Sequence, residues 1–405
     1  MSNYFKDHID YWTILVTLAL VAFGLVSIYS ATYDAGASDI LYKQLLYAGA
    51  GCFMMIVLLF LPFRFIQFIS YPAYFASILM LVSVLLLGKT VSGSTSWFNL
   101  GAFRLQPSEF TKITTVLALA TYLSRSDVTL SNFKNLAVAS GIVLLPVALI
   151  MLQPDTGTAM IYMCMFFPIL YWGGASRFTL LAIIAPGIAA LTALFGTTPF
   201  LIAIIILGVF IYLTKEHRIV AAVVFSVSVL VGISVQSIYD GLKPYQQKRI
   251  ATFLDPNADP LGAGYNVMQS KVAIGSGGFL GKGYLRGTQT QLNFIPEQWT
   301  DFIFCVPGEE FGFVGAFAVL MLFAALLSRS VWLGAAVKNP FGSIVAIGIG
   351  AIFCSHVFIN VGMSLGLLPV VGVPLPFLSY GGSALITNMV MVGLLLNLFA
   401  NRKEY

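Results

Sequence analysis

Twelve apolar stretches, most of them long enough to cross a lipid bilayer, dominate this sequence of 405 residues. A spanning helix needs about 20 apolar residues, with a lower limit of about 17. Asp, Glu, Lys and Arg make up only 9% of the chain, whereas soluble domains contain about 25%. The sequence therefore predicts an all-α polytopic membrane protein with about twelve transmembrane helices. The stretches are 11–30, 42–62, 66–88, 107–124, 135–152, 157–174, 178–195, 199–214, 218–235, 307–328, 342–367 and 380–400.

The short loops between these stretches carry Lys and Arg unevenly. If the N-terminus is cytoplasmic, eleven of these residues lie in inner segments and three lie in short outer loops. Basic residues in short loops favour the cytoplasmic side, so both termini are predicted to be cytoplasmic. The first stretch, 11–30, is long enough to remain as an uncleaved anchor.

One long polar segment, 236–306, interrupts the apolar stretches and is predicted to lie on the outer face. It holds eleven of the 37 charged residues in 71 positions. A segment of this length is usually functional or disordered, and its content of Tyr, Phe, Leu and Ile favours a functional one. We expect a single membrane domain, 1–405, that contains this extracytoplasmic loop, with a short helix near 263–274.

A glycine-rich tract at 275–283 has some likeness to a phosphate-binding loop. The P-loop pattern GxxxxGK[ST] fails, because Ser276 occupies the first glycine position and Gly283 the Ser/Thr position. The tract is interpreted as a flexible turn. The alternative is a backbone nest that binds an anionic lipid head group together with Lys282 and Arg286.

Asp301 stands where the polar segment turns into an apolar stretch. A carboxylate at such a rim can be partly desolvated and act as a general base. Glu297 lies on the same face if this piece is helical. The alternative, with similar weight, is that Asp301 caps the next helix.

Other polar residues lie at helix mouths on the same outer side. Glu109 and Lys112 have i,i+3 spacing and can form an ion pair, yet intramembrane charges are functional candidates by default. Asp155 is an outer-rim acid or a helix N-cap, and Trp97 is an interface aromatic or part of a site. Several such groups on one rim suggest an outward-facing site.

Three further charged or titratable positions have simpler structural interpretations. Glu309 and Glu310 begin an apolar stretch, where negative charge favours a helix N-terminus. His356 lies in the middle of a stretch and is interpreted as a hydrogen-bonded residue of helix packing.

Seven tracts carry a resemblance to a known family. They are QPSEFTK at 106–112, QPDTG at 153–157, DPNADPLGAGY at 255–265, QSKVAIGSGG at 269–278, GTQTQL at 287–292, TDFIF at 300–304 and LPVVGVPLPFLSYGGS at 368–383. The chain resembles the SEDS (shape, elongation, division and sporulation) family, and the tract at 287–292 favours its elongation members over its division members. Two departures are Trp299, where the family usually has His, and an extra helix pair predicted within 175–235 beyond the family's ten helices.

The resemblance implies a peptidoglycan glycosyltransferase of the bacterial inner membrane. Such proteins polymerise lipid II into glycan strands on the outer face and work with a class B penicillin-binding protein, a transpeptidase. Asp301 matches the family's essential loop aspartate, Trp97 its functional tryptophan, and Glu109 and Lys112 the Glu and Lys of its fourth helix. Neither nucleotide nor nucleic acid is expected as a partner.

On this basis Asp301 is predicted to be the general base for the acceptor 4-hydroxyl. The leaving pyrophosphate would be stabilised by Arg249, Lys271, Lys282 or a divalent cation, Mg²⁺ or Mn²⁺. The predicted substrate-binding residues are Trp97, Glu109, Lys112, Asp155, Arg249, Lys271, Lys282, Glu297 and Thr300.

Two function classes besides a polymerase agree with the same composition. One is a flippase or transporter of a lipid-linked precursor, which should have a charged path across the midplane and discontinuous helices. The other is a scaffold that recruits the penicillin-binding protein without catalysis. The charges gather at the outer rim, which favours surface chemistry.

Overall fold

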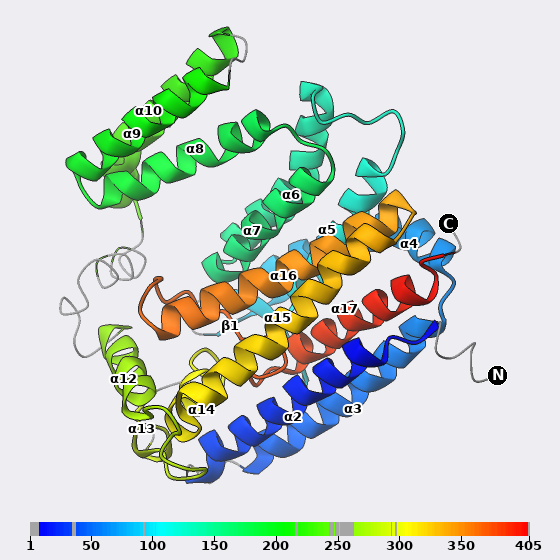
Figure 1. Ribbon diagram of the computed structural model, residues 1–405, viewed down its shortest axis with the longest axis vertical. Helices are drawn as coiled ribbons and strands as arrows, with labels where there is room; N and C mark the ends of the chain where they lie inside the picture. Colours follow the sequence, from blue (N-terminus) through cyan, green and yellow to red (C-terminus); the bar gives the residue numbers. More distant parts are fainter. Residues whose placement is uncertain are drawn as a thin grey trace.

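The computed structural model describes residues 8–34, 38–91, 94–101, 103–214, 218–242, 247, 251, 263–292, 294–295 and 298–403. Each of the twelve expected stretches coincides with a helix (Figure 1). These helices are α2 (Tyr11–Tyr33), α3 (Ser38–Phe60), α4 (Phe63–Leu87), α5 (Pro107–Leu123), α6 (Phe133–Leu152), α7 (Thr156–Trp172), α8 (Arg177–Leu194), α9 (Thr197–Leu213), α10 (Arg218–Asp240), α15 (Gly312–Ala336), α16 (Pro340–Ser364) and α17 (Gly382–Ala400).

Within the described residues, nine helices are long and apolar enough to cross a membrane. The other three of the twelve, α5, α7 and α9, each have 17 residues, which is the lower limit for a span. A helix satisfies all its interior backbone hydrogen bonds, so it is the natural conformation for an apolar run in lipid. The prediction of a polytopic all-α membrane protein is confirmed.

The two chain ends lie at the same end of the helix bundle (Figure 1). Asp10, which caps α2, pairs with Arg329 of α15 at 2.6 Å. The Arg329 guanidinium also lies over the ring of Phe399, near the end of α17. At the opposite end of α2, Ser30 contacts Gln291 and Glu310. The C-terminal part of the polar segment therefore packs at the end of the bundle opposite the chain ends.

The centre of the bundle is formed by α16 and α17, which are the most deeply buried of the candidate spans. One core cluster extends from Val16 of α2 through Val116 of α5 and Ile169 of α7 to Ile352 of α16. This packing fixes α5, α7 and α16 relative to one another.

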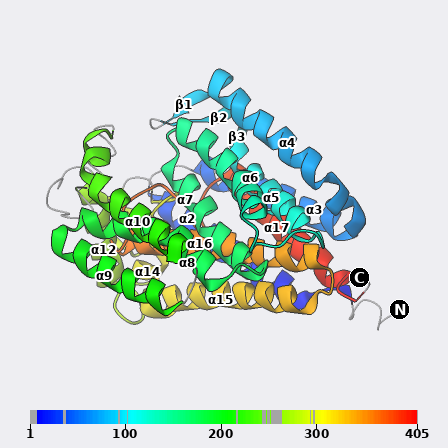
Figure 2. The same cartoon turned by 90° about the horizontal axis from the view of Figure 1, so that it is seen from above.

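Helices α8, α9 and α10 form a separate unit beside this bundle (Figures 1 and 2). They have a small core of their own, to which Ala185, Ala189, Ile204, Leu207 and Ile211 contribute. This unit occupies the region 175–235, where an extra helix pair is predicted. That two of these helices are an addition to a ten-helix plan stays a prediction.

Short elements connect several of the spans. The connection between α4 and α5 is an antiparallel sheet of three strands, β1 (Lys89–Val91), β2 (Ser94–Leu100) and β3 (Phe103–Leu105), in the order β1-β2-β3. This small sheet is the one departure, in the described residues, from the predicted all-helical chain. The polar segment contains α12 (Ala263–Ser276) and α13 (Thr288–Gln291), so the helix expected near 263–274 is present, and α14 (Cys305–Glu310) begins at the end of the segment.

Candidate active site

Asp301 lies in a turn that precedes α14 and is partly exposed. The N-cap of α14 is Phe304, without a side-chain hydrogen bond, so Asp301 does not cap this helix. Its carboxylate faces Gly372, where an added Cβ would lie 3.3 Å from Oδ2. Gly372 has a φ of +72°, a conformation that other residues adopt at a cost. The glycine therefore permits the close approach of backbone to the carboxylate.

The connection between α16 and α17, which we call the 365–381 segment, holds the backbone of residues 299–301. The Tyr380 N–H donates to the Trp299 carbonyl at 2.8 Å, and the Ser379 hydroxyl donates to the Thr300 carbonyl at 2.6 Å. The Asn360 amide of α16 donates to the Asp301 carbonyl at 2.8 Å. Three consecutive carbonyls are thus tied to one region, which fixes the position of Thr300 and Asp301.

A buried ion pair lies behind this segment. The Lys112 ammonium donates to Glu109 Oε1 at 2.9 Å, and their side chains are 0% and 4% exposed. Lys112 also lies 2.8 Å from Nε2 of His356. The Nδ1 of His356 lies 2.9 Å from the Pro374 carbonyl, which can only accept. His356 is therefore neutral, with its proton on Nδ1 and with Nε2 accepting from Lys112.

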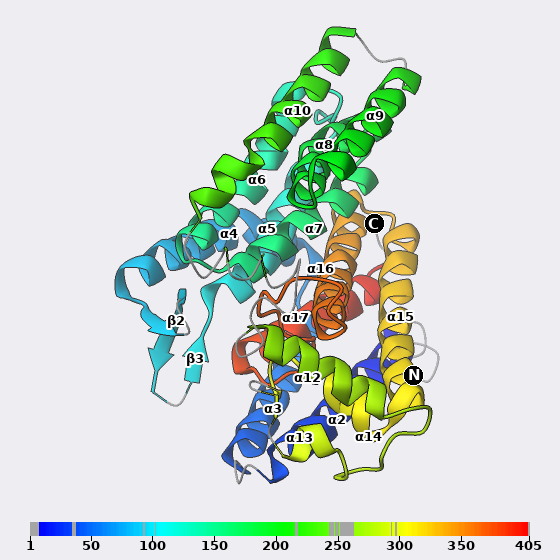
Figure 3. The same ribbon diagram turned by 90° about the vertical axis from the view of Figure 1, so that its left-hand side faces the viewer.

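Helix α12 lies beside the segment that follows α16 (Figure 3), and its Lys271 lies against Gly366 at the start of the 365–381 segment. Its side chain is exposed, and a Cβ added at Gly366 would lie 2.6 Å from its Nζ. Asp301 faces Gly372 of the same segment. One short stretch of chain therefore lies beside a half-exposed carboxylate and an exposed ammonium.

Asp155 is the N-cap of α7. Its carboxylate accepts from the Thr158 N–H at 3.0 Å and from the Thr158 hydroxyl at 2.8 Å. It also accepts from the Gln106 amide at 3.0 Å. The first turn of α7 packs against the 365–381 segment, since a Cβ at Gly157 would lie 2.9 Å from Val373 Cγ2.

Lys282 is engaged within the protein. Its ammonium lies 2.7 Å from Glu309 Oε1, and the Glu309 side chain is fully buried. The same carboxylate accepts from the N–H groups of Gln289 at 2.9 Å and Thr290 at 3.0 Å. Burial raises the pKa of Glu309, but the hydrogen bonds from Gln289, Lys282 and Thr290 outweigh it, so the pKa is lowered. Direct binding of substrate by Lys282 stays a prediction.

The pKa of Glu310, the next residue, shifts in the opposite direction. Burial raises its pKa, and hydrogen bonds from Ser30 and Gln291 offset this only in part. Its Oε2 is buried and has no hydrogen-bond partner among the described residues. Both acids make tertiary contacts, but they end α14 and do not lie in the first turn of α15, so the predicted place at the N-terminus of the span is wrong.

The glycine-rich tract is packed rather than flexible. The Lys282 N–H donates to the Glu309 carbonyl and the Gly283 N–H to the Glu310 carbonyl, each at 3.0 Å. A Cβ at Gly277 would lie 2.9 Å from the Glu309 carbonyl oxygen. These N–H groups bind protein carbonyls, so they form no open nest for an anion here.

The remaining predicted residues are Trp97, Arg249 and Glu297. Trp97 lies on β2, where its register partner is Lys89 of β1, and is partly buried. Arg249 and Glu297 lie outside the described residues. No group of three or more His, Cys, Asp or Glu side chains that could hold a metal ion occurs in the part of the chain that the structure describes.

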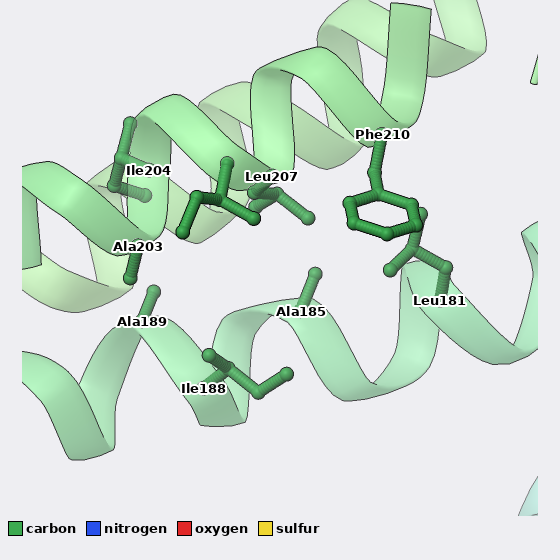
Figure 4. Close-up of a pocket in the computed structure, with 9 residues that line it drawn as sticks. Leu181, Ala185, Ile188, Ala189, Ala203, Ile204, Leu207 and Phe210 are labelled. Carbon is green, nitrogen blue, oxygen red and sulfur yellow. The ribbon is translucent and has the colours of Figure 1, made fainter. Parts of the chain in front are cut away.

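An apolar cavity lies away from this site, between α8 and α9 (Figure 4). It has a volume of about 290 Å³. Its lining is entirely aliphatic or aromatic: Leu181, Ala185, Ile188, Ala189, Ala203, Ile204, Ile206, Leu207 and Phe210. It presents no side chain that can transfer a proton or bind a phosphate.

Sequence reasoning missed the part played by Asn360, and it assigned His356 only to packing. Both are polar residues in a span, spaced i,i+4, and this spacing places them on one face of α16. Intramembrane polar residues are functional candidates. Two polar residues on one face of an apolar stretch, together with the family tract at 368–383, were the sequence pattern that could have indicated their role.

The chain matches a known protein family over nearly its whole length. The FtsW/RodA/SpoVE family, described as "Cell cycle protein", matches residues 11–197 and 182–404. The chain belongs to this family. The SEDS family resemblance is thereby confirmed.

Relatives of this SEDS protein match along nearly their whole length. The peptidoglycan glycosyltransferase MrdB of Escherichia coli is 36% identical, with 98% of this chain and 95% of MrdB covered. The peptidoglycan glycosyltransferase RodA of Treponema pallidum is 34% identical, covering 97% and 98%. The probable peptidoglycan glycosyltransferase FtsW of Trichlorobacter lovleyi is 32% identical, covering 97% and 94%.

Two solved structures are similar along nearly the whole chain. One, described as structural coordination of polymerization and crosslinking by a peptidoglycan synthase complex, has a TM-score of 0.75 at 29% identity. The alignment covers 98% of this chain and 99% of that chain. The rod shape determining protein RodA of Thermus thermophilus has a TM-score of 0.66 at 26% identity, covering 98% of each chain.

Proposed function

We propose that this protein is a RodA-like peptidoglycan glycosyltransferase that polymerises lipid II during cell elongation. The observation that carries the proposal is the full-length similarity to relatives of that activity. The fixed, partly exposed Asp301 supplies a chemical group suited to it. The division activity of FtsW is the alternative within the family, and the tract at 287–292 favours elongation.

Asp301 acts as the general base. Its carboxylate takes the proton of the acceptor sugar's 4-hydroxyl, and the freed oxygen attacks the anomeric carbon of the donor. The bond from that carbon to the pyrophosphate breaks, and the lipid pyrophosphate leaves with the electron pair. General base catalysis contributes about 10²–10⁴-fold, and the binding of two substrates in one orientation supplies much of the rest.

The leaving pyrophosphate gains negative charge, which a nearby cation stabilises. Lys271 fits this role because its ammonium is exposed beside the segment that faces Asp301. Arg249, Lys282 and a divalent cation, Mg²⁺ or Mn²⁺, are the other candidates for this role. We propose Trp97 and Thr300 as contacts that orient the sugars.

The reaction takes place on the outer face of the bacterial inner membrane, with both termini cytoplasmic. A class B penicillin-binding protein crosslinks the strands, as suggested by the similarity to a peptidoglycan synthase complex. A cysteine at Lys403 should react with an impermeant maleimide only after the inner membrane is permeabilised. Labelling of intact spheroplasts would reverse the assigned orientation.

The deciding experiment places the purified full chain in liposomes with labelled lipid II, with and without the partner. Glycan chains indicate a polymerase, leaflet exchange without chains indicates a flippase, and neither indicates a scaffold. Asp301→Asn keeps the shape of the side chain but removes its basicity, so it should abolish polymerisation while the protein remains folded. Polymerisation at the normal rate in this variant would remove Asp301 from the mechanism.

A further inference from the structure

We infer that Asn360 of α16 is a positioning residue that holds the Asp301 carboxylate in its reactive place. The inference rests on the proposed function, because it takes Asp301 to be the reacting group. It adds a residue that contacts no substrate in the proposed mechanism and acts through the backbone on both sides of the carboxylate.

The Asn360 amide joins two pieces of chain. Its Nδ2 donates at 2.8 Å to the Asp301 carbonyl and at 2.8 Å to the Val373 carbonyl. The side chain is completely buried. Both acceptors are carbonyls, so the orientation of the amide is fixed and both of its N–H groups are used.

The Asp301 and Val373 carbonyls lie next to the place where the Asp301 side chain meets the 365–381 segment. Val373 follows Gly372, the glycine that lies against Asp301 Oδ2. One amide therefore sets the position of the reacting residue and also that of the backbone that its carboxylate faces. A displacement of about 1 Å in a reacting group can reduce a rate about 10²-fold.

The oxygen of the Asn360 side chain has no hydrogen-bond partner among the described residues. The amide therefore acts here through its two donors and not through its acceptor. Leucine, which has a similar volume but no donor, isolates this contribution. Asn360→Leu removes both bonds with little change in packing volume.

Two other hydrogen bonds that hold the 365–381 segment remain in Asn360→Leu. His356 bonds to the Pro374 carbonyl, and the Ser379 hydroxyl bonds to the Thr300 carbonyl. We therefore expect a local shift at Gly372 and Asp301, and not the loss of the whole segment.

The chain offers a matched control at Asn397 of α17. This asparagine is also completely buried, and its Nδ2 donates to the carbonyls of Leu58 at 2.9 Å and Leu61 at 2.7 Å. Those carbonyls lie at the junction of α3 and α4, at the end of the bundle near the chain termini. Asn397→Leu removes these two bonds, together with longer ones to the Leu59 carbonyl and from the Asn401 amide, and does not touch Asp301.

The test compares the wild type, Asn360→Leu and Asn397→Leu as full chains in liposomes with lipid II and the partner, with rates referred to folded protein. Asn360→Leu should lower kcat at least tenfold and leave KM within about twofold, whereas Asn397→Leu should retain the wild-type kcat within about twofold. A wild-type kcat in Asn360→Leu, or an equal loss in both variants, would overturn the inference. If Asn360→Leu does not fold, Asn360→Ser takes its place with the same expectation.

A second readout does not depend on activity. Hydrogen exchange of the backbone amides of Val371, Gly372, Val373 and Leu375 should be faster in Asn360→Leu and unchanged in Asn397→Leu. Unchanged exchange in Asn360→Leu overturns the positioning role. A wild type that makes no glycan chains overturns the proposed function instead, and the exchange measurement still decides whether Asn360 holds the segment.

Discussion

Lys112 donates a hydrogen bond to Nε2 of His356 across two helices, although 244 positions separate them in the chain. Lys112 is also paired with Glu109, and His356 donates to the Pro374 carbonyl. A continuous polar connection therefore runs from a buried ion pair on α5 to the segment that faces Asp301. Both charged side chains of α5 are buried, so in this structure they act on the 365–381 segment from inside the protein, through His356.

Removal of one member of the buried pair should be costly. In Lys112→Met the Glu109 carboxylate is left buried without its ammonium, and such changes lower the free energy of unfolding by about 3–5 kcal/mol. The control is Arg125→Met, because the Arg125–Asp127 pair is exposed, at 57% and 66%, and an exposed pair contributes little to stability. Equal denaturant midpoints for the two variants would contradict a dry environment for Lys112.

Gly372→Ala should impair catalysis more than stability. A non-glycine residue in the left-handed conformation costs about 1–2 kcal/mol, and the new Cβ would also press on the Asp301 carboxylate. Gly174→Ala is the control, because Gly174 has a φ of +90° but nothing within 4 Å of an added Cβ. Similar melting temperatures with a selective loss of kcat in Gly372→Ala are expected. A selective loss in Gly174→Ala, or in neither, would argue against this contact.

Two substitutions of Asp155 separate a helix cap from a substrate ligand. Asn is as good an N-cap as Asp, whereas Ala costs about 1 kcal/mol. Asp155→Asn should therefore keep both stability and lipid II turnover, and Asp155→Ala should lower the melting temperature. If Asp155→Asn remains stable but loses turnover, the negative charge itself is needed and Asp155 contacts substrate.

Glu309 and Glu310 should give the stability of the protein opposite pH dependences. The pKa of Glu310 is raised, so stability is gained as pH falls through that pKa toward the ordinary value of 4.5. The pKa of Glu309 is lowered, so its contribution is complete above 4.5 and is lost as pH falls through its folded-state pKa. Melting temperatures from pH 8 to pH 3 test both statements.

The matched variants for this titration are Glu310→Gln and Glu309→Gln. Glu310→Gln should abolish the gain on mild acidification, and Glu309→Gln should abolish the loss at low pH and destabilise the protein at neutral pH. Identical pH profiles for the wild type and Glu310→Gln would show that Glu310 titrates normally.

The sequence alone determined the membrane architecture. Residues 11–30 or 380–400 form helices because an apolar run in lipid must satisfy its backbone hydrogen bonds internally, which is a local requirement. The same local reasoning predicted the polar segment, its helix near 263–274, and the position of Asp301 at the rim. The strands at 89–105 were missed because their pairing depends on neighbouring strands more than on local pattern.

Only the tertiary structure decided what the polar side chains do. Lys282 is an exposed cation by sequence, but folding places it on Glu309, 27 positions away. Lys112, His356 and Asn360 acquire their partners through the packing of α5, α16 and the 365–381 segment. Such contacts arise where helices distant in the chain are packed together, and burial then makes each polar group take the partner that packing provides.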